Sequence, residues 1–129
     1  MKLNRNMVGW FEIPVENMER AVKFYQEVFS VELTFAEFGP ELMAWFPMDN
    51  NLPGAPGALV KNDEAYTPSA KGVLIYFSAM SGDLNVELNR IEEAGGNVLM
   101  PKTLITEEIG YMALFLDTEG NRIALHSIK

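Results

Sequence analysis

The same order of segments occurs twice in this sequence. In residues 8 to 33 an apolar segment leads through a short turn into an amphipathic helical pattern and a second apolar segment, and residues 72 to 99 repeat that order. Identity between the copies is low, but a unit of this size cannot bury its own apolar face and needs a copy beside it. The repeat therefore predicts two modules that pack together and a cleft built by both.

Length limits how the two copies can be organised. A chain of 129 residues is long enough for one compact domain and short for two independent ones. We expect a single domain, 1–129, of two modules, about 6–61 and about 72–129. The residues between them, about 62–71, are polar, contain a proline and lack periodicity, which indicates a linker.

Charge and composition oppose several classes of partner. The formal net charge of −8 disfavours nucleic acid, whose binding requires clustered Lys and Arg; general solubility is the simpler explanation of the acidity. There is no apolar run of membrane-spanning length and no apolar stretch typical of a secretion signal, so we expect a cytoplasmic protein without a membrane partner. The absence of cysteine excludes disulfides and thiolate metal sites.

Hydrophobic periodicity assigns the elements of the first module. The spacing predicts a strand over 8–15, with Pro14 near its margin, and a helix with Asn17 as its N-cap. One face of this helix is apolar at Met18, Ala21, Val22, Tyr25, Val28 and Phe29. Further strands are predicted over 31–38, 41–48 and 57–61.

The second module repeats this order. A strand over 73–79 precedes a helix that Asp83 caps and Gly95-Gly96 ends. Strands follow over 97–106, 110–117 and 122–128, and Gly120 is available for a positive φ in the turn between the last two. Each module is thus β-α-β-β-β, which predicts an α+β fold.

Four separated segments carry a family resemblance. They are Phe-Glu-Ile-Pro-Val at 11–15, Met-Glu-Arg-Ala-Val-Lys-Phe-Tyr at 18–25, Ile-Glu-Glu-Ala-Gly-Gly at 91–96 and Asp-Thr-Glu-Gly-Asn-Arg-Ile at 117–123. In this order the chain resembles the vicinal oxygen chelate superfamily, which includes glyoxalases, bleomycin resistance proteins and extradiol dioxygenases. The resemblance covers nearly the whole chain and implies two β-α-β-β-β modules whose mixed, curved sheets form a cup around a pocket.

The resemblance also implies where a catalytic metal would be held. Metal-using members take one ligand, usually His or Glu, from the first and the last strand of each module. On the first strands the corresponding positions are Trp10 and Leu74. On the last strands they are a position near Leu59 in the first module and Ala124 in the second. None has a suitable donor atom, so we expect no metal cofactor.

Alternation along the strands then predicts the lining of the cup. If Trp10 points inward, Glu12 does also, and the same parity selects Leu74, Tyr76, Ala124 and His126. On the middle strands Met43, Trp45, Tyr111 and Ala113 are predicted wall residues, although alternation does not fix the phase there. Such a pocket is aromatic, has few polar groups and suits a flat or amphipathic organic molecule.

Each of these residues has a structural alternative. Glu12 is a candidate base or hydrogen-bond acceptor, or a carboxylate at a wet sheet face beside a cation. His126 is a candidate general acid or base or a displaced metal ligand, or an exposed residue near the C-terminus. Trp10, Trp45 and the tyrosines can contact a ligand or simply pack. Lys61 can attract an anion or lie solvated at a strand end.

Two classes of function follow. The first is metal-free binding or sequestration of a small, partly aromatic organic compound. The second is an enzyme of the lyase, isomerase or dioxygenase type, with Glu12 as base or with a divalent metal held by a shifted set such as Glu12 and His126. The resemblance also implies a homodimer, in which modules join within one chain or across chains; the identity of the ligand stays open.

Overall fold

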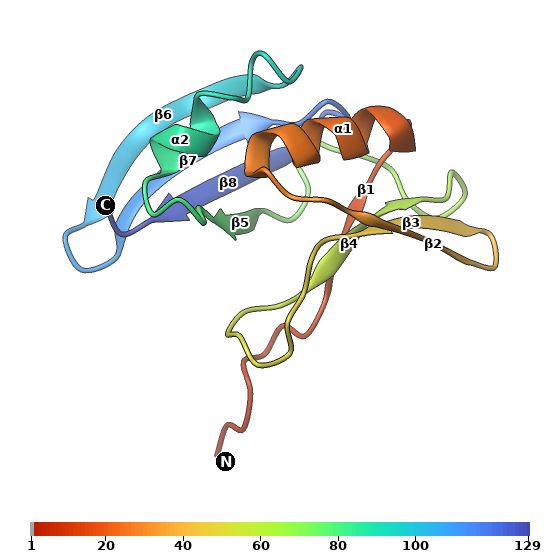
Figure 1. The fold of residues 1–129 in the computed structure, drawn as a ribbon, viewed down its shortest axis with the longest axis horizontal. Helices are drawn as coiled ribbons and strands as arrows, with labels where there is room; N and C mark the ends of the chain where they lie inside the picture. The colour runs from red at the N-terminus through yellow and green to blue at the C-terminus, as the bar shows by residue number, and fades with distance from the viewer. Residues whose placement is uncertain (1) are drawn as a thin grey trace.

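The computed structural model describes residues 2–129 and contains two four-stranded mixed sheets and two helices (Figure 1). The first module comprises β1 (Phe11–Pro14), α1 (Met18–Phe29), β2 (Thr34–Phe38), β3 (Glu41–Trp45) and β4 (Gly57–Lys61). The second comprises β5 (Ile75–Ser78), α2 (Leu84–Leu88), β6 (Asn97–Thr106), β7 (Gly110–Leu116) and β8 (Arg122–Ser127).

Both sheets have the same topology. The strand order is β1-β4-β3-β2 in one and β5-β8-β7-β6 in the other. In each, the first strand of the module pairs parallel with the last, and the remaining neighbours are antiparallel. The repeat is therefore present in three dimensions, and the predicted α+β fold class is confirmed.

Helix α1 follows from its sequence. The side chain of Asn17 accepts a hydrogen bond from the Arg20 N–H at 3.0 Å, which confirms the predicted N-cap. All six apolar positions of the predicted stripe are buried, and Phe24 is buried as well. A helix that packs on one sheet needs only one apolar stripe, so the additional buried position indicates a second packing surface.

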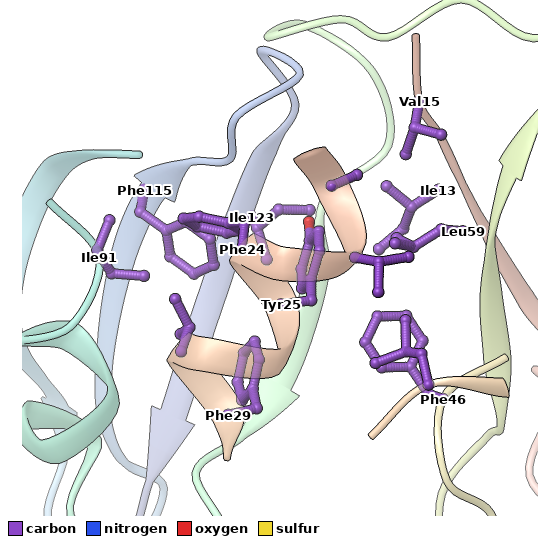
Figure 2. Packing of buried hydrophobic residues seen from close by; sticks show 14 of the residues in the cluster. Ile13, Val15, Phe24, Tyr25, Phe29, Phe46, Leu59, Ile91, Phe115 and Ile123 are labelled. Atoms are coloured by element: carbon purple, nitrogen blue, oxygen red, sulfur yellow. The ribbon is translucent and has the colours of Figure 1, made fainter. Parts of the chain in front are cut away.

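That second surface is the other module's sheet. Figure 2 shows α1 between the two sheets, with Phe24 near Phe115 on one side and the residues Ile13 and Leu59 on the other. Phe24 and Phe115 have ring centroids 5.9 Å apart, and both side chains are fully buried. The helix sides of both sheets thus share one hydrophobic core.

Polar contacts reinforce the junction between the modules. The buried Tyr25 hydroxyl donates to Asp117 Oδ2 at 2.6 Å, and burial, followed by the neighbouring carboxylate, raises the Tyr25 pKa well above its ordinary value. The predicted turn at 117–121 has Gly120 at a φ of 88°. This turn also presents Glu119, which accepts hydrogen bonds from the backbone N–H groups of Glu16 and Asn17 at 2.9 and 2.8 Å.

Glu119 also forms an ion pair with Arg20, with Arg20 Nε 2.8 Å from Glu119 Oε2. Desolvation raises the Glu119 pKa, but the hydrogen bonds from Arg20, the Asn17 N–H, Thr118 and the Glu16 N–H outweigh it and lower the pKa to about 2. A turn of the second module therefore binds the start of the first module's helix.

The second helix is shorter than predicted. Asp83 caps α2 as expected, but regular helix ends at Leu88 and the chain continues in turns to Gly95. Close packing explains the following glycine, because a Cβ on Gly96 would lie 2.5 Å from the Leu116 carbonyl oxygen and 2.8 Å from the Phe24 ring. Neither helix in residues 2–129 has the length and apolar character needed to cross a bilayer.

Candidate functional site

The site residues predicted in the first module lie on the side of its sheet away from the shared core. We call this side, with Trp10, Glu12, Met43, Trp45 and Tyr66, the module-one open face. Strand register explains the grouping, because Glu12 pairs with Ala58, which in turn pairs with Trp45, and Met43 pairs with Val60. Met43, Ala58 and Val60 form a second, smaller apolar cluster, against which Trp45 and Tyr66 pack.

Glu12 lies at the centre of a hydrogen-bonded group on this face. Its carboxylate accepts from the Tyr66 hydroxyl at 2.5 Å and from Trp10 Nε1 at 3.2 Å. The bond to Glu12, burial and repulsion from the carboxylates of Glu12 and Glu41 raise the pKa of Tyr66 to about 12. Tyr66 therefore stays protonated at neutral pH and acts as a donor to Glu12.

Tyr66 was not among the predicted site residues. It comes from the polar linker, where turn hydrogen bonds from the Ala65 and Tyr66 N–H groups to the Asn62 carbonyl bring the chain back over the sheet. An aromatic residue alone in a polar, proline-containing segment is the signal in the sequence that could have identified it.

Aromatic rings surround the carboxylate. Trp10 and Trp45 meet edge to face, with centroids 5.7 Å apart, and Phe38 stacks on Trp45 at 5.8 Å. Trp10 and Phe38 keep 37% and 54% of their surface accessible, so part of each side chain is available to a ligand. Trp45 Nε1 is buried without a hydrogen-bond partner in the described residues, an arrangement that costs free energy unless an acceptor is supplied.

The residues predicted in the second module lie on the corresponding side of the other sheet, the module-two open face. Tyr76 pairs with Ala124 and Ser78 with His126. Tyr76 is half exposed, and its hydroxyl contacts Met112 Sδ at 3.7 Å. His126 Nε2 lies 2.5 Å from the Ile109 carbonyl oxygen and donates a hydrogen bond to it.

Two expectations about orientation are wrong. Tyr111 and Ala113 lie on the helix side, against the shared core, and Lys102 Nζ lies 4.6 Å from the centre of the Tyr111 ring. Met112 and Leu114 occupy the open side instead, opposite His126 and Ala124. Strand β7 carries apolar residues on both sides, so alternation in the sequence could not predict which of them face the helices.

The last-strand position in the first module also changes. Leu59 is fully buried in the shared core, and the open-face residue of β4 opposite Glu12 is Ala58. Ala58 corresponds to Ala124, which pairs with Tyr76 in the second module. This places a methyl group at the equivalent position of both modules.

The four positions implied for a metal therefore carry Trp10, Ala58, Leu74 and Ala124. An indole nitrogen and aliphatic side chains offer no lone pair for coordination, so these residues do not fit the metal. No group of three or more metal-ligating side chains occurs within residues 2–129. Glu12 and His126 lie on the open faces of different sheets, and two donors are fewer than a protein site normally uses.

The two open faces do not meet within one chain. Both sheets turn their helix sides toward α1, so each open face lies on the far side of its sheet from the shared core (Figure 2). Hollows of about 580 and 400 Å³ occur near His126 and near Lys61, but neither is lined by Trp10, Glu12 or Trp45. In a single chain the module-one open face is accessible at Trp10 and Phe38, whereas Met43 is buried.

The open faces also differ in charge. Glu41 pairs with Phe38 and so shares the side of Glu12. On the other sheet, Arg122 pairs with Leu116 and shares the side of Ala124 and His126, and Arg122 Nε is buried without a partner in the described part of the chain. Lys61, the last residue of β4, forms an ion pair with Asp63, with Lys61 Nζ 3.0 Å from Asp63 Oδ1.

Comparison with known proteins gives one family and a set of similar folds. The family model described as Glyoxalase/Bleomycin resistance protein/Dioxygenase superfamily matches residues 7–125. No curated protein matches the sequence.

This chain covers nearly the whole length of three similar solved structures, whereas it covers 46% of a glyoxalase I mutant from Zea mays. A glyoxalase/bleomycin resistance protein from Albidiferax ferrireducens is 16% identical, with a TM-score of 0.70 over 93% of this chain and 97% of its own. An antibiotic binding protein from a Streptomyces species is 24% identical, with a TM-score of 0.62 over 98% of each chain. A fosfomycin resistance protein from Listeria monocytogenes is 17% identical, with a TM-score of 0.64 over 97% of this chain and 92% of its own. At these identities the likeness establishes the fold alone.

Proposed function

Since the chain belongs to the glyoxalase/bleomycin resistance protein/dioxygenase superfamily, we propose that it binds or sequesters a small, partly aromatic organic compound without a metal. The observation that supports this most directly is the module-one open face, where aromatic rings surround a single hydrogen-bonded carboxylate. Ligand sites combine apolar walls with a few placed polar groups, as this face does. The Streptomyces relative is described as an antibiotic binding protein, which is a function of the same class.

The lack of donor atoms at the four implied metal positions supports binding over the family's metal-dependent reactions. A metal held elsewhere is the alternative. Metal analysis of the purified protein, with melting temperatures measured with and without Zn²⁺, Ni²⁺, Mn²⁺ and Fe²⁺, distinguishes the two. We expect substoichiometric metal and no stabilisation; one bound ion per chain with a raised melting temperature contradicts the proposal.

A second copy of the chain completes the site in this proposal. The module-one open face carries Glu12 and Glu41, and the module-two open face carries Arg122, so the two faces are complementary in charge. Because they do not meet within one chain, a homodimer would bring one face of each kind together and enclose the ligand. Sedimentation equilibrium at micromolar concentration is expected to give twice the mass of one chain, and a monomer at every concentration contradicts it. The cytoplasmic setting expected from the sequence belongs to the same proposal.

Ligand binding itself can be followed through Trp10, which is partly exposed on the site. We expect a screen of flat aromatic compounds to yield ligands that quench tryptophan fluorescence and raise the melting temperature. Trp10→Leu should remove binding, whereas Tyr25→Phe, in the shared core, should retain it. Binding that survives Trp10→Leu unchanged places the ligand elsewhere.

One observation favours a second function, proton transfer by Glu12. It is supported by the 2.5 Å hydrogen bond from Tyr66 to Glu12, which holds a carboxylate in place on the module-one open face. If this function is present, Glu12→Gln abolishes turnover of a carbonyl substrate and leaves its binding intact. Unchanged turnover in that variant removes the enzymatic alternative.

A further inference from the structure

Within residues 2–129, the carboxylate of Glu12 has hydrogen bonds but no cationic partner. Its partners are the neutral groups of Tyr66 and Trp10, and no Lys, Arg or His in residues 2–129 forms an ion pair with it. Lys61 lies on the adjacent strand β4, but it pairs with Leu42, which is on the helix side of the sheet, and its ammonium group binds Asp63. A partly buried carboxylate without a cation is a site where an external positive charge gains attraction.

The rings around Glu12 add to that attraction. Tyr66 and Trp10 meet the carboxylate through their hydroxyl and Nε1 donors, at the ring edges, and Trp45 and Phe38 extend the aromatic surface. The face of an aromatic ring carries a negative potential and attracts a cation within about 6 Å, and several rings beside a carboxylate form the arrangement that recognises amines and quaternary ammonium groups.

Surrounding charge acts in the same direction. Glu41 lies on the same side of the sheet and is close enough to Tyr66 to raise its pKa. The whole chain has a net charge of −8, which attracts a cation from solution and repels an anion.

We propose that the ligand of the module-one open face is an organic cation, an amine or quaternary nitrogen joined to a flat apolar group, with its charge beside Glu12 and its flat part against Trp10 and Trp45. This inference rests on the proposed binding function and specifies its ligand class.

Three probes of nearly equal shape test the charge. They are N-methylquinolinium, which is cationic, 1-methylnaphthalene, which is neutral, and 1-naphthoate, which is anionic. Binding to the full-length protein is measured by quenching of tryptophan fluorescence. We expect the cation to bind about tenfold more tightly than the neutral probe and the anion to bind most weakly. Added salt should weaken the binding of the cationic probe and leave the binding of the neutral probe unchanged.

Variants locate the charge. Glu12→Gln should remove the preference for the cation and keep the affinity for the neutral probe. Glu37→Gln is the matched control, because Glu37 is exposed on the same sheet and pairs with Leu42 on the opposite side; its preference should be that of the wild type. Circular dichroism confirms that both variants are folded.

The outcomes separate the two proposals. Equal binding of all three probes, or a preference that survives Glu12→Gln, overturns the cationic ligand and leaves aromatic binding in place. Tighter binding of the anion also overturns it and points to Arg122 on the other open face. Failure of the folded protein to bind any probe overturns both proposals.

Discussion

The two modules are alike on one side of their sheets and different on the other. On the helix sides, Ile13 and Leu59 of the first module correspond to Phe77 and Leu125 of the second, and all four are apolar residues of the shared core. On the open faces, Glu12 corresponds to Tyr76. Packing in a common core restricts both copies to apolar residues, whereas a face that takes no part in that core is free to differ. The open faces are therefore where function has to be sought.

The largest effect is expected on the helix side, at Phe24. Its side chain is fully buried between the two sheets, so Phe24→Ala should lower the free energy of unfolding by about 4 kcal/mol through lost contacts and a cavity. Phe35→Ala is the control, because Phe35 is 56% exposed and its replacement should cost about 0.5 kcal/mol. Urea unfolding should show one transition for both variants; two separate transitions in the wild type would mean that the modules do not share a core.

A smaller effect is expected at Glu119, which joins the second module to the start of α1. Glu119→Gln should cost about 2 kcal/mol at pH 7, because the variant loses the ion pair with Arg20. The folded-state pKa of about 2 lies below the ordinary value of 4.5, so this stabilisation is present above pH 4.5 and is lost as the pH falls toward 2. The unfolding free energies of the wild type and of Glu119→Gln should therefore converge as the pH is lowered from 7 to 2. A difference that stays constant over this range contradicts the low pKa of Glu119.

Tyr25 tests the same junction at high pH. Tyr25→Phe removes the hydroxyl that donates to Asp117 and should cost about 1.5 kcal/mol at pH 7. The Tyr25 pKa is raised above its ordinary value of 10.0, so the wild type keeps this contribution below pH 10 and loses it as the pH rises further. Melting temperatures should fall more steeply above pH 10 in the wild type than in the variant. Equal slopes would show that Tyr25 does not titrate with unfolding.

The smallest effect on stability is expected on the open faces. Trp10 corresponds to Leu74, the residue just before β5 in the second module. Trp10→Leu should therefore lower the free energy of unfolding by only about 1 kcal/mol, through the lost contact with Trp45. Tyr76→Phe, on the other open face, should change the free energy of unfolding by less than about 0.5 kcal/mol. Thermal unfolding checks both, and a loss as large as that of Phe24→Ala would show that the open faces also carry the core.

The sequence patterns predicted which helices and strands are present better than they predicted the residues at which these begin and end. The strands at 57–61 and 97–106 have the predicted bounds, because turn residues or helix-ending glycines delimit them. The first strand begins at Phe11 rather than at residue 8, since pairing with β4 begins only there. Tyr111 was assigned to the wrong side because an apolar strand has no alternation from which to read a face. Tyr66 was missed because its role depends on a contact with Glu12 across 54 positions of the chain.

The sequence by itself determined the duplicated α+β fold, the family and the absence of donor atoms at Trp10, Leu74 and Ala124, because these depend on local patterning and on the chemistry of single residues. Only the tertiary structure decided that α1 lies between both sheets, that Ala58 rather than Leu59 is on the open face, and that Tyr66 meets Glu12. The physical reason is that alternation and helical periodicity specify which residues share a face. They do not specify which face of one module packs against the other, because that is decided by burial of apolar surface across the whole chain.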